Sequence, residues 1–127
     1  MARILIAEDE EGIRSLVARA LAQDGHDVLT ANDGAEALDL LARERGDFAL
    51  LLTDIRMPVM DGIALALAAA RDHPAVAILL MTGYADQRER AHGLDALIHD
   101  VITKPFSLAS IRAAVTEALA VNAGHMH

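Results

Sequence analysis

Acidic, basic and hydroxyl side chains stand at the ends of several short apolar runs in this sequence. In chain order these residues are Glu8, Asp9, Glu10, Asp54, Thr82 and Lys104. Carboxylates that are crowded together repel one another, and the repulsion raises their proton affinity unless a cation relieves it. Mg²⁺ suits such a cluster best, because it keeps several waters and needs only a few carboxylate ligands. If the fold gathers these residues, they predict a Mg²⁺ site.

The same residues indicate phosphoryl transfer. A bound Mg²⁺ would attract a phosphoryl group and neutralise its oxygens, while Lys104 adds a second cation and Thr82 adds a hydroxyl donor. Phosphoryl transfer depends mainly on positioning and on charge neutralisation, which this set supplies. An aspartate carboxylate such as that of Asp54 is then a competent nucleophile and forms an acyl phosphate.

Five apolar runs alternate with amphipathic segments along the chain. The run at residues 3–7 has no polar alternation, as a strand buried on both faces should have none. The five runs predict strands over residues 3–7, 27–31, 49–53, 76–81 and 98–103. Helices are expected over about 13–21, 34–41, 62–72, 85–92 and 108–119, with Gly25 ending the first and with Asp33, Asp61 and Ser107 capping the second, third and last.

Strands that alternate with helices in this way predict an α/β domain with a parallel sheet and right-handed crossovers. All strands of a parallel sheet point the same way, so side chains at their carboxyl ends meet at one edge. Ligand sites of open α/β sheets lie at that edge. We therefore expect the acidic residues after the first strand to form one cluster with Asp54, Thr82 and Lys104.

Composition restricts the class of protein. The 127 residues suffice for one domain, and 54% of them are hydrophobic. The formal net charge of −8 repels nucleic acid and anionic lipid, so we expect neither a nucleic acid partner nor a membrane partner. The chain has no cysteine for disulfides or zinc and no apolar run long enough to span a membrane. From residues 1–3, which lead directly into a short apolar run, we expect no signal peptide. We expect a cytoplasmic protein.

Four motifs, each at a predicted strand end, together resemble one known family. They are Glu8-Asp9, Thr53-Asp54-Ile55-Arg56-Met57-Pro58 with Asp61-Gly62, Thr82-Gly83, and Lys104-Pro105-Phe106. From Ala2 to about Leu119 the chain resembles the receiver domain of two-component response regulators. The resemblance implies a doubly wound, flavodoxin-like sheet of five parallel strands in the order 2-1-3-4-5. We expect this domain over residues 1–121 and a frayed tail over 122–127, with no output domain, as in single-domain chemotaxis-type regulators.

The resemblance also implies roles at the matching positions. Asp54 would accept the phosphoryl group. Mg²⁺ would be bound by the carboxylates of Asp9 and Asp54 and by the backbone carbonyl of Arg56, and Glu8 would act through a metal-bound water. Lys104 would pair with the phosphoryl group.

Further residues of the motifs would shape the phosphoryl site. Thr82 would swing toward the phosphoryl group, and Gly83 would leave the site uncovered. The bond between Lys104 and Pro105 would be cis.

The chain departs from the family pattern near the expected switch. Val101 stands three residues before Lys104, where the family usually has an aromatic switch residue. Tyr84, two residues after Thr82, and Arg56, two after Asp54, occupy positions that tune dephosphorylation in the family. We expect a long-lived phosphorylated form.

The leading functional hypothesis is a switch rather than a turnover enzyme, which promotes only its own phosphorylation and dephosphorylation. A sensor histidine kinase or a histidine phosphotransfer protein would donate the phosphoryl group, and the domain would bind an unknown effector protein in one phosphorylation state only, which the sequence does not identify. The alternative is a phosphate shuttle or sink in a phosphorelay, which the sequence does not separate from the switch.

Other classes fit the residues less well. A phosphatase of the haloacid dehalogenase type needs a second aspartate where Arg56 stands, and the acidic residues from Glu8 onward would repel the phosphate of a flavin. A degenerate receiver that binds its partner constitutively is disfavoured by the intact set of site residues.

Overall fold

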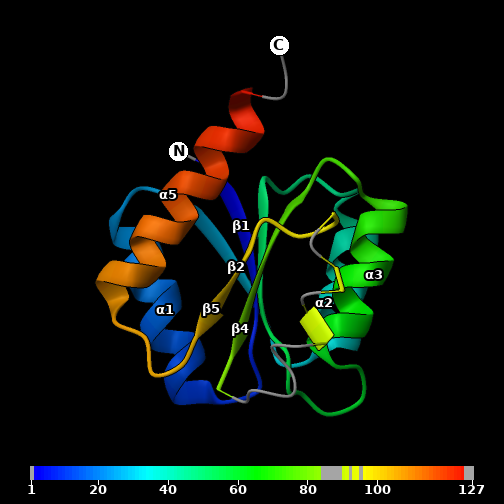
Figure 1. Cartoon of the computed structure of the whole chain (residues 1–127), viewed down its shortest axis with the longest axis horizontal. Helices are drawn as coiled ribbons and strands as arrows, with labels where there is room; N and C mark the ends of the chain where they lie inside the picture. Colours follow the sequence, from blue (N-terminus) through cyan, green and yellow to red (C-terminus); the bar gives the residue numbers. More distant parts are fainter. Residues whose placement is uncertain (1, 84–89, 92, 95, 125–127) are drawn as a thin grey trace.

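The structure, a computed structural model, describes residues 2–83, 90, 91, 93, 94 and 96–124 (Figure 1). Its five strands form one parallel sheet in the order β2-β1-β3-β4-β5. They are β1 (Arg3–Ala7), β2 (Asp27–Ala31), β3 (Leu50–Asp54), β4 (Ala77–Thr82) and β5 (Asp100–Thr103). The helices are α1 (Glu11–Gln23), α2 (Gly34–Arg43), α3 (Gly62–Asp72) and α5 (Leu108–Gly124).

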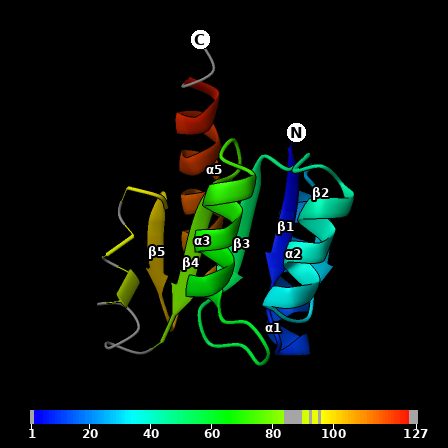
Figure 2. The same cartoon turned by 90° about the vertical axis from the view of Figure 1, so that its right-hand side faces the viewer.

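The sheet is the middle of three layers. Helices α1 and α5 cover one face and α2 and α3 cover the other, as Figures 1 and 2 show. The predicted α/β class, the doubly wound arrangement and the strand order are confirmed.

Alternate residues of each central strand are buried on opposite faces of the sheet. In β1, Ile4 and Ile6 pack with the residues of α1 and α5, whereas Leu5 and Ala7 pack with those of α2 and α3. Burying one large aliphatic side chain contributes about 1.5–3 kcal/mol. This double burial explains why the central strands read as continuous apolar runs.

The strand bounds differ from the predicted ones at the functional edge. Asp54 and Thr82 are the last residues of β3 and β4, whereas the apolar runs suggested that they follow the strands. The ladder continues through them because Asp54 pairs with Met81 and Thr82 pairs with Thr103. At the other end, β5 begins at Asp100 rather than at residue 98. Ile98 is buried but does not belong to the strand. Hydrophobicity alone does not distinguish a buried strand residue from a buried residue that precedes the strand.

The predicted capping residues are confirmed, although α1 begins at Glu11 rather than at residue 13. The side chains of Asp33 and Asp61 accept hydrogen bonds from the backbone N–H groups three residues later, each at 2.8 Å. Ser107 does the same for the Ser110 N–H at 3.0 Å. Each such cap contributes about 1 kcal/mol. Gly25 follows α1 with a φ of +91°, a conformation that favours glycine.

Three expectations fall wholly or partly outside the described residues. The predicted helix over 85–92 has only its residues 90 and 91 described, and both are helical. Tyr84 also lies outside the described residues. Helix α5 continues to Gly124, into the segment that we expected to be a frayed tail from residue 122, and residues 125–127 are outside the description.

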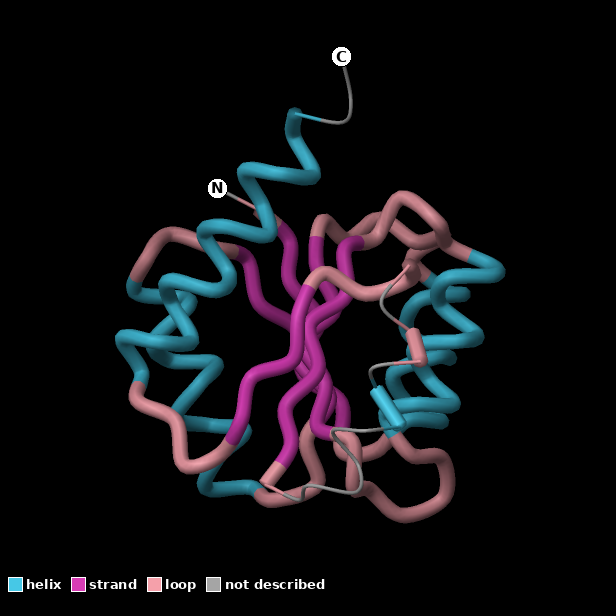
Figure 3. Tube along the Cα trace, in the orientation of Figure 1, coloured by secondary structure: helices cyan, strands magenta, loops and turns pink. Residues whose placement is uncertain are grey.

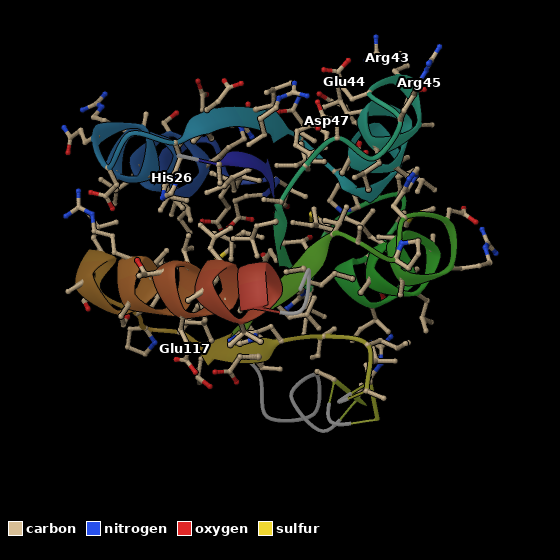
Figure 4. All side chains as sticks on the ribbon, turned by 90° about the horizontal axis from the view of Figure 1, so that it is seen from above. His26, Arg43, Glu44, Arg45, Asp47 and Glu117 are labelled. Atoms are coloured by element: carbon tan, nitrogen blue, oxygen red, sulfur yellow. The ribbon has the colours of Figure 1, made fainter. Side chains whose placement is uncertain are left out.

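Loops gather at the two ends of the sheet (Figure 3). The amino-terminal end carries an ion-pair cluster in which Arg3 binds Asp27, Glu44 and Asp47 at 2.7–3.3 Å. Figure 4 looks onto this end and shows Glu44 and Asp47 at the turn between α2 and β3. The predicted site lies at the opposite, carboxyl end of the strands. Among the described residues, no helix is both long and apolar enough to cross a membrane.

Candidate functional site

Three carboxylates meet at the carboxyl end of the central strands. Oxygen atoms of Glu8, Asp9 and Asp54 lie within 4.8 Å of one another. Glu8 and Asp9 follow β1, and Asp54 ends the neighbouring strand β3, so the parallel pairing of these two strands brings them together. Glu8 is fully buried, Asp54 is nearly so, and Asp9 is exposed.

Lys104 adds a positive charge to this group. Its Nζ atom lies 3.3 Å from Oδ2 of Asp54 and 3.6 Å from Oε1 of Glu8. The backbone around it is held by β4, because the Lys104 N–H donates to the Thr82 carbonyl at 2.7 Å. The peptide bond between Lys104 and Pro105 is cis.

Burial and charge shift the proton affinities of two of these groups. Burial of Glu8, assisted by repulsion from Asp54, raises the pKa of the Glu8 carboxyl to about 8. Burial acts against the charge of Lys104, but the carboxylates of Asp54 and Glu8 outweigh it and raise the pKa of the Lys104 ammonium. One lysine is therefore shared between two carboxylates.

Asp9 and Asp54 line a pocket of about 580 Å³, whereas Glu8 is buried beneath it and is not part of its lining. Its lining consists of Asp9, Glu10, Ile13, Asp54, Arg56, Gly83 and Lys104. Glu10 lies on the lining, in agreement with its place in the expected acidic cluster, whereas Ile13 was not among the predicted site residues. Ile13 lies in the first turn of α1, four residues after Asp9, and no signal in the sequence marked it as a site residue.

The donor set fits a hard divalent cation. Both carboxylate oxygens of Glu8 are buried and have no hydrogen-bond partner among the described residues. Burying an ionised carboxylate without hydrogen bonds costs several kcal/mol unless a cation compensates its charge. Glu8, Asp9 and Asp54 offer oxygen ligands on neighbouring strands, which is the chemistry that Mg²⁺ prefers. These residues would hold the ion.

The backbone of Asp54 is fixed by residues whose role the sequence did not show. The hydroxyl of Thr53 donates to the Asp54 carbonyl at 2.9 Å. Gly62 approaches the same carbonyl so closely that a Cβ atom at position 62 would overlap the oxygen. The loop between β3 and α3 therefore closes tightly against Asp54. The glycine that follows Asp61 in the motif was the only sequence signal for this contact.

The remaining predicted residues occupy different surroundings. Thr82 is buried at the end of β4 and is not part of the pocket lining. Gly83 is exposed on the lining, and a Cβ atom there would lie 3.5 Å from Cβ of Lys104, an ordinary contact. Val101 is half-buried in β5 and packs against the core on the side of α2 and α3.

Known proteins with similar sequences and folds are response regulators. Response regulator MprA of Mycobacterium leprae is 36% identical over 113 residues, which cover 89% of this chain and 49% of that protein. The chain thus spans about half the length of this curated relative. A receiver domain protein from Methanospirillum hungatei has a TM-score of 0.89 at 28% identity, covering 98% of both chains. The response regulator TrrA of Thermotoga maritima, solved in complex with Mg²⁺-BeF, has a TM-score of 0.81 at 28% identity, covering 93% of this chain and 98% of that one.

The family model of the response regulator receiver domain matches residues 4–116. Receiver domains of this family are phosphoryl acceptors that bind Mg²⁺ at an acidic pocket and interact with histidine kinases or phosphotransfer proteins. The matched residues include the whole acidic pocket and its lysine. The chain belongs to the response regulator receiver domain family.

Proposed function

We propose that Asp54 accepts a phosphoryl group from a phosphohistidine in a Mg²⁺-dependent reaction. The donor would be a sensor histidine kinase or a histidine phosphotransfer protein. The observation that carries this proposal is the position of Asp54 between a lysine and two further carboxylates. Its Oδ2 atom is 3.3 Å from Nζ of Lys104, and its carboxylate lies within 4.8 Å of those of Glu8 and Asp9.

In the proposed reaction a carboxylate oxygen of Asp54 attacks the phosphorus. A P–O bond forms while the P–N bond of the phosphohistidine breaks, and the imidazole leaves. Lys104 would neutralise the phosphoryl oxygens, because its ammonium group already lies beside the Asp54 carboxylate that would carry them. Mg²⁺ bound at the three carboxylates would supply the remaining neutralisation. The complex of the similar domain TrrA with Mg²⁺-BeF supports this assignment.

The shape of the site supports transfer from a large donor. The pocket is open and has a volume of about 580 Å³, enough for a histidine side chain. Gly83 on its lining adds no side chain that would narrow the entrance. Arg56 and Lys104 place positive charge on a lining that also carries three acidic residues, and this positive charge favours the entry of a phosphoryl group.

We further propose that the domain signals by binding an effector protein in one phosphorylation state only. Phosphate-dependent capture of a partner other than a kinase would support this switch. Rapid return of the phosphoryl group to a histidine protein, with no other partner, would favour the shuttle instead.

Incubation with Mg²⁺ and acetyl phosphate, followed by intact mass spectrometry, tests the acceptor. We expect the wild type to gain one phosphoryl group, and the gain to vanish with EDTA or in Asp54→Asn. Asp47→Asn is the matched control, because Asp47 is exposed at the opposite end of the sheet. Phosphorylation of Asp54→Asn, or of the wild type without divalent cation, would contradict the assignment. A time course after removal of the donor then measures how long the phosphorylated form lasts.

A further inference from the structure

We propose that Arg14 is a positioning residue of the Mg²⁺ site and acts through the backbone that carries Glu8 and Asp9. This inference depends on the proposed Mg²⁺-dependent function. Arg14 lies in α1, is half-buried, and is not part of the pocket lining. Its effect on the site must therefore pass through the residues that it contacts.

Arg14 holds the segment between β1 and α1. Its Nη1 atom donates to the backbone carbonyl of Glu8 at 2.9 Å. The N–H of Glu8 donates in turn to the carbonyl of Ala31 at 3.1 Å. The backbone of Glu8 is thus bound by β2 on one side and by Arg14 on the other. The carbonyl that Arg14 binds belongs to the peptide unit that leads into Asp9.

This backbone contact matters because the side chains themselves are weakly anchored. The buried carboxylate of Glu8 has no hydrogen-bond partner among the described residues, and Lys104 approaches it only to 3.6 Å. The Asp9 side chain is exposed, so packing does not hold it. The position of both carboxylates therefore depends on their main chain. Mg²⁺ demands near-ideal ligand geometry, and loss of a group that orients its ligands weakens metal binding.

The direction in which Mg²⁺ affinity changes when Arg14 is removed distinguishes a positioning role from a purely electrostatic one. The guanidinium of Arg14 is positive, and a positive charge near a cation site weakens cation binding. If Arg14 acted only through its charge, removing it would tighten Mg²⁺ binding. If Arg14 orients the ligand backbone, removing it loosens Mg²⁺ binding.

Isothermal titration calorimetry with Mg²⁺ tests this on the full chain. In Arg14→Met, which keeps the apolar stem and removes the donor, we expect the Kd for Mg²⁺ to rise about tenfold. In Arg14→Lys, which keeps one donor, we expect a partial recovery of affinity. Arg19→Met is the matched control, because Arg19 is an exposed arginine of the same helix. It loses the same charge, and we expect its Kd to stay equal or to fall slightly.

Unfolding in urea without Mg²⁺ separates a loss of ligand geometry from a loss of fold. An Arg14→Met protein that folds and binds Mg²⁺ as tightly as the wild type, or more tightly, overturns the inference. If Arg14→Met does not fold, Arg14→Lys decides the question, and an unchanged Kd in that variant overturns the inference. Absence of Mg²⁺ binding by the wild type would instead overturn the proposed function and this inference with it.

Discussion

Replacing Glu8 with glutamine tests the buried charge at the centre of the site. In the folded protein the pKa of Glu8 is raised from its ordinary value of 4.5 to about 8, mainly by burial. Between these two values the folded chain binds more protons than the unfolded chain. The free energy of unfolding therefore falls as the pH rises through this window. The stability that the protonated Glu8 provides is complete below about pH 4.5 and is lost by about pH 8.

The size of this stability change follows from the distance between the two pKa values of Glu8. Each tenfold change in a proton equilibrium corresponds to about 1.4 kcal/mol, so the window from 4.5 to about 8 sets an upper limit of roughly 5 kcal/mol. Relaxation of the surrounding protein lowers this cost, and we expect roughly 2–5 kcal/mol. Glutamine is close in shape to the protonated acid and carries no charge at any pH. Glu8→Gln should match the wild type near pH 5 and exceed it in stability near pH 8.5.

Urea denaturation followed by circular dichroism, in EDTA and at several pH values, measures the difference. Taking the difference between the two proteins cancels the titrating groups that do not interact with Glu8, including the exposed Asp72, whose pKa Arg71 lowers. Adding Mg²⁺ near pH 8 should then stabilise the wild type more than the variant, because the ion compensates the buried charge. A stability difference that stays constant from pH 5 to 8.5, or a variant less stable than the wild type at pH 8.5, would refute this reasoning.

Three further substitutions test the loop and the lysine. Val59 has a φ of +69° in a turn closed by a bond from the Met60 N–H to the Pro58 carbonyl, and its side chain is 84% exposed. Val59→Gly should therefore relieve strain and raise the free energy of unfolding by about 1 kcal/mol in urea denaturation; a loss of stability would contradict this. Gly62→Ala should lower the free energy of unfolding by roughly 2–4 kcal/mol in the same assay, because the new Cβ overlaps the Asp54 carbonyl. A variant as stable as the wild type would show that the loop can move away without cost. Lys104→Met should slow phosphorylation by acetyl phosphate on the order of a hundredfold, measured by mass spectrometry, and an unchanged rate would remove the lysine from the reaction.

The sequence by itself determined the layers of the fold. Apolar runs at nearly regular spacing predicted every strand of the sheet, and capping residues such as Asp33, Asp61 and Ser107 marked the helix starts. These signals are local: a cap bonds within one helical turn, and a strand buried on both faces needs apolar residues throughout. Because the carboxyl ends of parallel strands meet at one edge of the sheet, the sequence also predicted that Glu8, Asp9, Asp54 and Lys104 lie together there.

The strand ends and the groups that hold the site were decided by contacts between distant segments. Asp54 belongs to β3 because Met81 of β4 pairs with it, and no residue near Asp54 encodes that partner. Thr53 was visible in a motif, but only the packed loop shows that its hydroxyl binds the Asp54 carbonyl.

The tertiary structure also decided the electrostatics of the site and its support. Complete burial of Glu8 makes it the carboxylate with a raised pKa, although Asp9 beside it in the chain is exposed. Nothing in the sequence distinguished Arg14 from other helix residues, and only the fold shows that its guanidinium donates to the Glu8 carbonyl. Sequence patterns fix which residues can reach the edge of the sheet, whereas burial and hydrogen bonding depend on how closely the layers pack there.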